Sequence, residues 1–443
     1  MKRDIEADLL NWKNSKIRMP LLVRGARQVG KTHVVEAFGL KHFENLVSIN
    51  LEERPEFKNC FNTLNPQNII AEIEILANAS IVPGKSLLFL DEIQECPAAI
   101  TAFRYFKERM PELHIIGAGS LLEFVLNDEE FRMPVGRVQS LYLKPMSFNE
   151  FLEATGRNKL RSYLTQVTLE QPPSEAIHAQ ALAYVREYLA LGGMPAVINA
   201  YCQTKSIRDC QTIQTDLLTT YRNDFGKYAK RIQVKYLQKV FQQTPGLIGK
   251  ELVYSQIDSE SPSRDIKIAL DKLCDAGLVT RVYATHASEI PLFAGINEKK
   301  SKLFFIDVGL VKRAMLLDIE VLLQQDIMLI NQGALAEQLV AQELLVYQDR
   351  HDVGQLFYWL RNKKGSDAEV DFVVSRGELI VPVEVKSGAT GRLKSIRVFM
   401  EEKNSPIGVR ISQKPLHFEK GLLSLPFYLI AEFSRLVSRS VLF

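Results

Sequence analysis

Residues 25–32 read GARQVGKT and stand between the apolar run LLV at residues 21–23 and the helix-like segment VVEAF at residues 34–38. This order predicts a strand, a glycine-bounded loop and a helix. In such a loop, backbone N–H groups and the helix N-terminus surround phosphate oxygens, and glycines let the backbone turn where a Cβ would clash. Lys31 would reach the terminal phosphates, and the Thr32 hydroxyl would bind Mg²⁺. ATP and Mg²⁺ are therefore the expected cofactors, and the predicted nucleotide-binding residues are Gly25, Ala26, Arg27, Gln28, Val29, Gly30, Lys31 and Thr32.

A second motif, SLLFLDEIQ at residues 86–94, ends an apolar strand in two acids. Asp91 is expected to complete the magnesium shell, and Glu92 to orient and deprotonate the attacking water. An acidic turn after a buried strand would show the same pattern, but the upstream glycine loop favours the catalytic interpretation. The two motifs together predict an enzyme that hydrolyses ATP.

Two further polar residues lie beside predicted strands. Ser120 follows HIIGAG at residues 114–119. It suits both a sensor of the γ-phosphate and the N-cap of the helix that SLLEFVL predicts, and both roles stay open. Arg137, in VGRVQ at residues 135–139, is a candidate arginine finger that would stabilise charge in the transition state. Taken alone, it is better explained as a surface arginine.

Length and composition limit the class of protein. A chain of 443 residues is too long for one domain, and 46% hydrophobic with 24% charged residues is typical of a folded soluble protein. The five cysteines form no CxxC pair, so we expect reduced thiols, no zinc site and a cytoplasmic location. No apolar run is long enough for a membrane span. The net charge of +3 neither requires nor excludes a nucleic-acid partner.

The middle of the chain reads as helical from about residue 159 to residue 230, broken by Gly192, Gly193 and Pro195, which predict a corner between helices. Residues 231–308 then give three short helices and two strands, the pattern of a winged helix. The third helix offers Arg264 and Lys267, and the wing carries Lys299, Lys300 and Lys302, which suit contacts with DNA phosphates. Asp265 and Asp271 weigh against DNA, so packing or protein docking stays an equal alternative.

Near the C-terminus, VPVEVKSG at residues 381–388 places two charges inside an apolar strand. Glu384 and Lys386 share one face because strand side chains alternate, and a strand containing Asp371 pairs with theirs if AEVDFVV forms a hairpin with LIVPVEVK. This is the spacing of PD-(D/E)xK nucleases. Asp371 and Glu384 would bind Mg²⁺, and Lys386 would help to activate water. The expected additional acid is Glu337, with Glu343 and Glu369 as substitutes, while polar residues facing solvent or forming an ion pair are the plain alternative. The basic residues Arg361, Lys363 and Lys364 would guide a phosphate backbone or only keep a loop soluble.

The motifs GARQVGKT, LLFLDEIQ, GAGSLLEF, GRVQSLYLKPMSFNEFL, LGGMPAVI and KLFFIDVGL together resemble a prokaryotic family of AAA-type ATPases. The resemblance covers nearly the whole chain. It implies a helical and winged-helix middle, a C-terminal nuclease-like domain of unknown function, a sensor role for Ser120 and a finger role for Arg137.

We therefore predict an α/β multidomain protein whose P-loop (ASCE) parallel sheet is sandwiched by helices and followed by a restriction-endonuclease-like α/β domain. The expected domains are the ATPase at residues 1–158, a helical lid at 159–230, the winged helix at 231–308 and the nuclease-like domain at 309–443. Nucleic acid, DNA rather than RNA, and further copies of the chain, with Arg137 acting in trans, are the expected partners. The alternative function is an ATP-switched module whose inactive nuclease-like tail docks a protein or nucleic acid.

Overall fold

The computed structural model describes residues 1–120, 122, 126, 136–228, 231–317, 333–361, 368–387 and 393–440. These residues form two compact units. Unit 1 contains Met1–Lys144 with the short pieces Asp275–Gly277 and Asp349–Val353, and unit 2 contains Pro145–Cys274, Leu278–Gln348 and Gly354–Phe443. Within the described residues, no helix combines the length and the apolar character that a membrane span requires.

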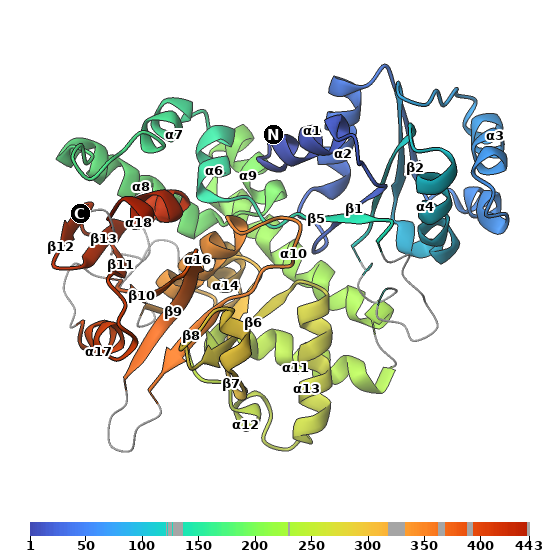
Figure 1. Cartoon of the computed structure of the whole chain (residues 1–443). Helices are drawn as coiled ribbons and strands as arrows, with labels where there is room; N and C mark the ends of the chain where they lie inside the picture. Colours follow the sequence, from blue (N-terminus) through green and yellow to red (C-terminus); the bar gives the residue numbers. More distant parts are fainter. Residues whose placement is uncertain are drawn as a thin grey trace. The chain divides into compact units, whose positions relative to one another are not determined.

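Unit 1 is built on a five-stranded sheet whose neighbouring strands are all parallel, in the order β2-β3-β4-β1-β5. The strands are β1 (Leu21–Arg24), β2 (Asn45–Asn50), β3 (Ser86–Asp91), β4 (His114–Ala118) and β5 (Gln139–Tyr142). All six residues of β3 and all five of β4 are buried, as expected for inner strands covered on both faces. The predicted parallel sheet is thereby confirmed (Figure 1).

Helices cover both faces of this sheet. They are α1 (Ile5–Asn14), α2 (Lys31–His42), α3 (Pro66–Ala77) and α4 (Pro97–Arg109), with the 3₁₀ turns η1 (Pro55–Asn62) and η2 (Ile93–Glu95). Apolar side chains of α3 and α4 pack with Leu22, Leu88 and Leu90 in one core. α2 lies against the other face, where Gly39 approaches Leu87. Because the strands are parallel, the loops after β1, β3 and β4 all emerge at one edge, the carboxyl edge.

Helices make up the first part of unit 2, as the sequence predicts. They are α6 (Phe148–Ala154), α7 (Asn158–Leu164), α8 (Glu175–Leu191), α9 (Pro195–Thr204), α10 (Ile207–Tyr228), α11 (Arg231–Leu247), α12 (Tyr254–Ile257) and α13 (Ser263–Asp275). The predicted corner separates α8 from α9, and Gly192 adopts a φ of 77° there. In α13 the apolar residues Ile266, Leu270 and Leu273 are fully buried.

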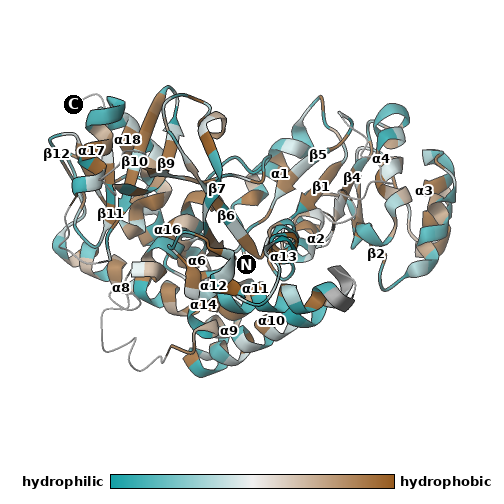
Figure 2. Ribbon diagram, turned by 90° about the horizontal axis from the view of Figure 1, so that it is seen from below, coloured by the Kyte–Doolittle hydropathy of each residue, from teal (hydrophilic) through white to brown (hydrophobic). Residues whose placement is uncertain are grey.

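The rest of unit 2 is organised by a mixed eight-stranded sheet in the order β12-β13-β11-β10-β9-β8-β6-β7. Its strands are β6 (Val279–Thr285), β7 (Ile296–Phe305), β8 (Phe357–Leu360), β9 (Glu369–Arg376), β10 (Leu379–Val385), β11 (Gly408–Ser412), β12 (His417–Glu419) and β13 (Leu422–Pro426). The accompanying helices are α14 (Val308–Ala314), α16 (Ala334–Val346), α17 (Lys394–Lys403) and α18 (Phe433–Ser440), with the turns η3 (Leu292–Gly295) and η5 (Phe427–Glu432). In Figure 2, α10 alternates brown with teal, which fits a helix with one apolar face.

Two features of this second sheet bear on the sequence predictions. β9 and β10 form the predicted antiparallel hairpin, with Val383 opposite Phe372. β6 and β7, the strands expected to form the wing, also pair with each other, but β6 continues the sheet through parallel pairing with β8. The predicted domain boundary between residues 308 and 309 therefore falls within the span of a single sheet.

Candidate functional site

The glycine loop of unit 1 joins β1 to α2, and its first residue has to be glycine. Gly25 adopts a φ of 137°, and a Cβ at this position would lie 2.1 Å from the carbonyl oxygen of Leu143. Lys31, the first residue of α2, directs its Nζ back over the loop, where it donates to the carbonyls of Gly25 (2.9 Å) and Ala26 (2.8 Å). Burial lowers the pKa of Lys31 to about 8. The lysine thus already lies over the loop that would receive the phosphates.

The predicted magnesium ligands of unit 1 touch each other. Thr32 Oγ1 donates to Asp91 Oδ2 over 2.7 Å, so β3 and the start of α2 meet at the carboxyl edge. Asp91 is only 4% exposed, and burial raises its pKa. A hydroxyl and a carboxylate are the hard oxygen ligands that Mg²⁺ prefers, and a bound cation would offset the burial of the carboxylate. The donor set therefore fits Mg²⁺.

The next residue, Glu92, has an uncommon backbone conformation with a φ of 47°. Its Oε2 accepts hydrogen bonds from Gln94 Nε2 (2.7 Å) and from Ser120 Oγ (3.3 Å). Ser120 therefore lies at the same edge, in contact with Glu92. The helix that would make it an N-cap falls largely outside the described residues. The structure brings together five predicted residues, Lys31, Thr32, Asp91, Glu92 and Ser120.

Arg137 is not part of this cluster. It lies just before β5, and because Gln139 is paired in parallel with Leu21, this is the amino edge of the sheet. Its Nε bonds to Glu108 near the end of α4 at 3.3 Å, and the side chain is 48% exposed. The glycine loop follows the opposite end of β1. Arg137 therefore does not reach the nucleotide site of its own chain.

Arg3 supports the loop, although no sequence motif marks it. The side chain is 5% exposed and donates to the carbonyl of Val29 (2.8 Å) and to the carbonyl of Lys144 (2.7 Å). It thereby ties the loop to the segment that follows β5. A single arginine far ahead of the motif has no characteristic spacing, so only the tertiary contacts identify it.

The second candidate cluster lies in unit 2, where α16, β9 and β10 meet. Asp371 Oδ2 accepts a hydrogen bond from the Val385 backbone (2.8 Å), and Lys386 Nζ lies 2.6 Å from Glu384 Oε1. Among the described residues, Glu337 Oε2 and Glu384 Oε2 are buried without a hydrogen-bond partner. Burial, followed by the charge of Asp371, raises the pKa of Glu337 to about 8 and that of Glu384 to about 7. The predicted residues are therefore adjacent, and two of their oxygens have no hydrogen-bond partner among the described residues.

Lys302 belongs to this cluster, and the expectation that it contacts phosphates from the wing is wrong. The side chain is 1% exposed, and its Nζ lies 2.5 Å from Glu369 Oε1 and 3.9 Å from Glu337 Oε2. A lysine buried in this way cannot reach a nucleic-acid backbone. It acts instead as an internal counter-ion for the acids.

The fit of the unit 2 cluster to a metal ion is incomplete. Within the part of the chain that the structure describes, no three His, Cys, Asp or Glu side chains gather so as to hold a metal. The acids already have internal partners, namely the Val385 N–H for Asp371, Lys386 for Glu384 and Lys302 for Glu369. In this form the cluster is an ion-pair network rather than a metal centre.

The remaining predicted residues of unit 2 lie elsewhere. Glu343 is fully buried and accepts from the Phe148 backbone (3.0 Å), which separates its role from that of Glu337 on the same helix. Arg361 pairs with Glu402, its Nε lying 2.9 Å from the carboxylate, whereas Lys363 and Lys364 lie outside the described residues.

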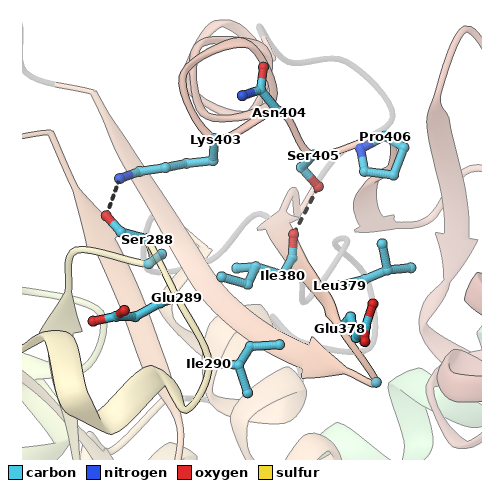
Figure 3. Close-up of a pocket in the computed structure, with 12 residues that line it drawn as sticks. Ser288, Glu289, Ile290, Glu378, Leu379, Ile380, Lys403, Asn404, Ser405 and Pro406 are labelled. Atoms are coloured by element: carbon cyan, nitrogen blue, oxygen red, sulfur yellow. Dashed lines mark hydrogen bonds between the residues drawn. The ribbon is translucent and has the colours of Figure 1, made fainter.

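A pocket of about 370 Å³ in unit 2 contains none of the predicted residues. It is lined by residues 287–290, 377–380 and 403–406. Figure 3 shows the hydrogen bonds across it, from Lys403 to Ser288 (2.9 Å) and from Ser405 to the carbonyl of Ile380 (2.8 Å). Its lining includes neither the glycine loop of unit 1 nor the acids and lysines of the second cluster, so this pocket is not the candidate site.

Comparison with protein families assigns part of the chain. Residues 18–152 match the model described as an AAA domain. Residues 182–321 and 332–429 match two models described only as domains of unknown function, DUF8612 and DUF4143. No curated protein matches the chain. The N-terminal unit is therefore an AAA-type P-loop domain, and the nuclease-like character of the C-terminal part remains a prediction.

Solved structures show a distant likeness. The Walker-type ATPase paby2304 of Pyrococcus abyssi is 14% identical with a TM-score of 0.45, covering 71% of this chain and 95% of its own. The Orc1 protein of Aeropyrum pernix in complex with DNA is 13% identical with a TM-score of 0.30, covering 73% and 95%. RuvB of Thermotoga maritima is 15% identical with a TM-score of 0.30, covering 63% and 89%. At such scores, the likeness adds nothing to the family match.

Proposed function

We propose that the protein is a Mg²⁺-dependent ATPase of the AAA type whose nucleotide cycle moves a C-terminal, nuclease-like domain associated with nucleic acid. The contact between Thr32 and Asp91 carries the ATPase part of the proposal, because it joins the glycine loop to the acidic pair at the edge where Lys31 already lies. The match of residues 18–152 to an AAA domain supports it independently.

The chemistry follows from the positions of these groups. Backbone N–H groups of residues 25–30 and the N-terminus of α2 would hold the phosphates, and Lys31 would neutralise their charge. Thr32 and Asp91 would hold Mg²⁺, which supplies further charge neutralisation when bound. Glu92 would take a proton from water as the water oxygen bonds to the γ-phosphorus. The bond between that phosphorus and the bridging oxygen breaks, and ADP leaves with the electron pair.

Two substitutions test the ATPase. Lys31→Ala should abolish hydrolysis and weaken nucleotide binding, whereas Glu92→Gln should abolish hydrolysis and leave binding of ATP intact. Matched controls are Lys41→Ala on the same helix and Glu95→Gln, both of which change exposed ion pairs and should keep wild-type turnover. Wild-type turnover in purified Lys31→Ala or Glu92→Gln protein would refute the assignment.

A second activity, cleavage of nucleic acid, is favoured by two buried carboxyl oxygens, Glu337 Oε2 and Glu384 Oε2, that have no hydrogen-bond partner among the described residues. Buried carboxyl oxygens without a hydrogen-bond partner are costly, which gives a reason to expect a ligand there. Incubation with single- and double-stranded DNA and RNA, in Mg²⁺ or Mn²⁺, tests it against Asp371→Ala and Lys386→Ala. Cleavage that both substitutions remove supports a nuclease. Absence of cleavage favours the alternative, an ATP-switched tail that docks a partner.

The face of α13 supports DNA as the partner, because Arg264 and Lys267 are exposed there. Asp271, which weighed against DNA, is paired with Arg281 at 3.0 Å, so part of its charge is neutralised within the protein. Replacing Arg264 and Lys267 with alanine should weaken binding to duplex DNA and reduce its dependence on salt. Unchanged binding in a gel-shift titration would exclude this face.

A further inference from the structure

Two hydrogen bonds hold the carboxylate of Glu92, the proposed general base, in one orientation. Gln94 Nε2 and Ser120 Oγ both donate to the same oxygen, Oε2, over 2.7 Å and 3.3 Å. Ser120 follows the end of β4 and Gln94 lies in η2, so the two donors approach this oxygen from different elements. Together they fix the plane of the carboxylate. The other oxygen, Oε1, is then presented in a constant direction, which is what proton transfer from a single water requires.

Gln94 reaches Glu92 with the nitrogen of its side-chain amide, whereas the amide oxygen, Oε1, is buried and has no hydrogen-bond partner among the described residues. This oxygen lies where a Cβ of residue 119 would be, 2.1 Å from the ideal position, so Gly119 makes room for it. The Gln94 amide therefore reaches from beside Gly119, at the end of β4, to Glu92, and the missing Cβ of Gly119 leaves room for it.

We propose that Gln94 is a positioning residue for ATP hydrolysis, which orients the Glu92 carboxylate towards the attacking water. The proposal rests on the ATPase function. It adds to that function a residue outside the glycine loop, the acidic pair and Ser120. Since Gln94 acts through Glu92, its loss should change turnover and leave the affinity for nucleotide alone.

Two replacements of Gln94 separate hydrogen bonding from space filling. Gln94→Met keeps a similar length without a donor, and Gln94→Ala removes the bulk as well. Both should lower kcat by about tenfold, because a base that is free to rotate loses orientation, while the Kd for ATP measured by titration stays within twofold.

Gly119 provides an independent displacement of the same amide. A methyl group in Gly119→Ala would meet the far end of a flexible side chain, so Gln94 should rotate away and kcat should fall as in Gln94→Met. In the double variant Gly119→Ala/Gln94→Ala the methyl group meets no obstacle from Gln94. Its kcat should therefore equal that of Gln94→Ala rather than fall again.

The outcomes distinguish this proposal from the function on which it rests. No hydrolysis by the wild-type protein would remove the ATPase itself. Hydrolysis by the wild type with unchanged kcat in Gln94→Met would overturn the positioning role and leave the ATPase standing. A raised Kd for ATP with unchanged kcat would make Gln94 a structural residue and overturn the positioning role as well.

Discussion

At the scale of single residues, the phosphate loop depends on Gly25. The backbone there has a φ of 137°, and a Cβ would lie 2.1 Å from the Leu143 carbonyl oxygen, an atom that cannot move without shifting the backbone. We expect Gly25→Ala to lower the free energy of unfolding of unit 1 by about 2–4 kcal/mol, because strain and a backbone clash combine. Urea denaturation measures the loss, and binding of a fluorescent ATP analogue should fall at least tenfold.

Gly84→Ala is the control for backbone strain. Gly84 also has a positive φ, of 79°, but a Cβ there meets open space. The expected cost is only about 1 kcal/mol, the usual cost of a left-handed alanine, with ATP binding unchanged. Equal losses in the two variants would show that the Leu143 contact does not matter.

Residue-level prediction from the sequence succeeds where chemistry imposes a spacing. Lys31, Thr32, Asp91 and Glu92 stand in two short motifs, and the structure brings them to one edge of the sheet. Arg3 and Lys302 have no such spacing, and their roles arise from partners 26 and 67 residues away, Val29 and Glu369. Such partners become visible only when the chain is folded.

At the scale of elements, Glu343 joins α16 to the start of α6. Its carboxyl accepts from the Phe148 backbone over 3.0 Å and lies 3.3 Å from the Tyr188 hydroxyl. Burial raises the pKa of Glu343 to about 8, so the folded protein keeps a proton that the unfolded chain releases above its ordinary pKa of 4.5. The contribution of Glu343 to the free energy of unfolding is therefore greatest below pH 4.5 and is lost as the pH rises through 8.

Glu343→Gln cannot ionise and keeps the carbonyl that accepts from Phe148. The difference in unfolding free energy, variant minus wild type, should rise between pH 5 and pH 8 by at most about 1.4 kcal/mol per pH unit. Glu343→Ala should be less stable than Glu343→Gln throughout, because the Phe148 N–H loses its acceptor. A difference between Glu343→Gln and wild type that does not change with pH would show that the carboxyl is ionised in the fold.

Helices and strands could be predicted from the periodicity of apolar residues, but which strands pair with each other could be predicted only in part. The five strands of unit 1 and the β9–β10 hairpin follow from local patterns and short turns. The pairing of β6 with β8 joins residues more than seventy positions apart, for example Tyr283 with Phe357. No local pattern encodes that pairing. The boundary predicted at residue 308 therefore separates strands that belong to one sheet.

At the scale of the whole molecule, Arg137 raises the question of how many chains make one active site. It lies at the amino edge of the parallel sheet, whereas the glycine loop lies at the carboxyl edge, across a strand of four residues or about 13 Å. An arginine that is half exposed at one edge can serve a nucleotide only in another copy of the chain. The finger role and a monomeric active enzyme are therefore mutually exclusive.

Mixing two inactive variants tests this. Arg137→Ala keeps an intact Glu92 but lacks the finger, and Glu92→Gln keeps the finger but lacks the base. If the finger acts in trans, each protein alone should hydrolyse ATP poorly, and an equimolar mixture should regain activity that increases with total protein concentration, because a Glu92→Gln subunit supplies Arg137 to its neighbour. Arg104→Ala, which removes the other arginine paired with Glu108, should behave like the wild type. The finger role would be excluded by wild-type turnover in Arg137→Ala, or by a mixture no more active than its components. Arg137 would then be only a surface residue that forms an ion pair with Glu108.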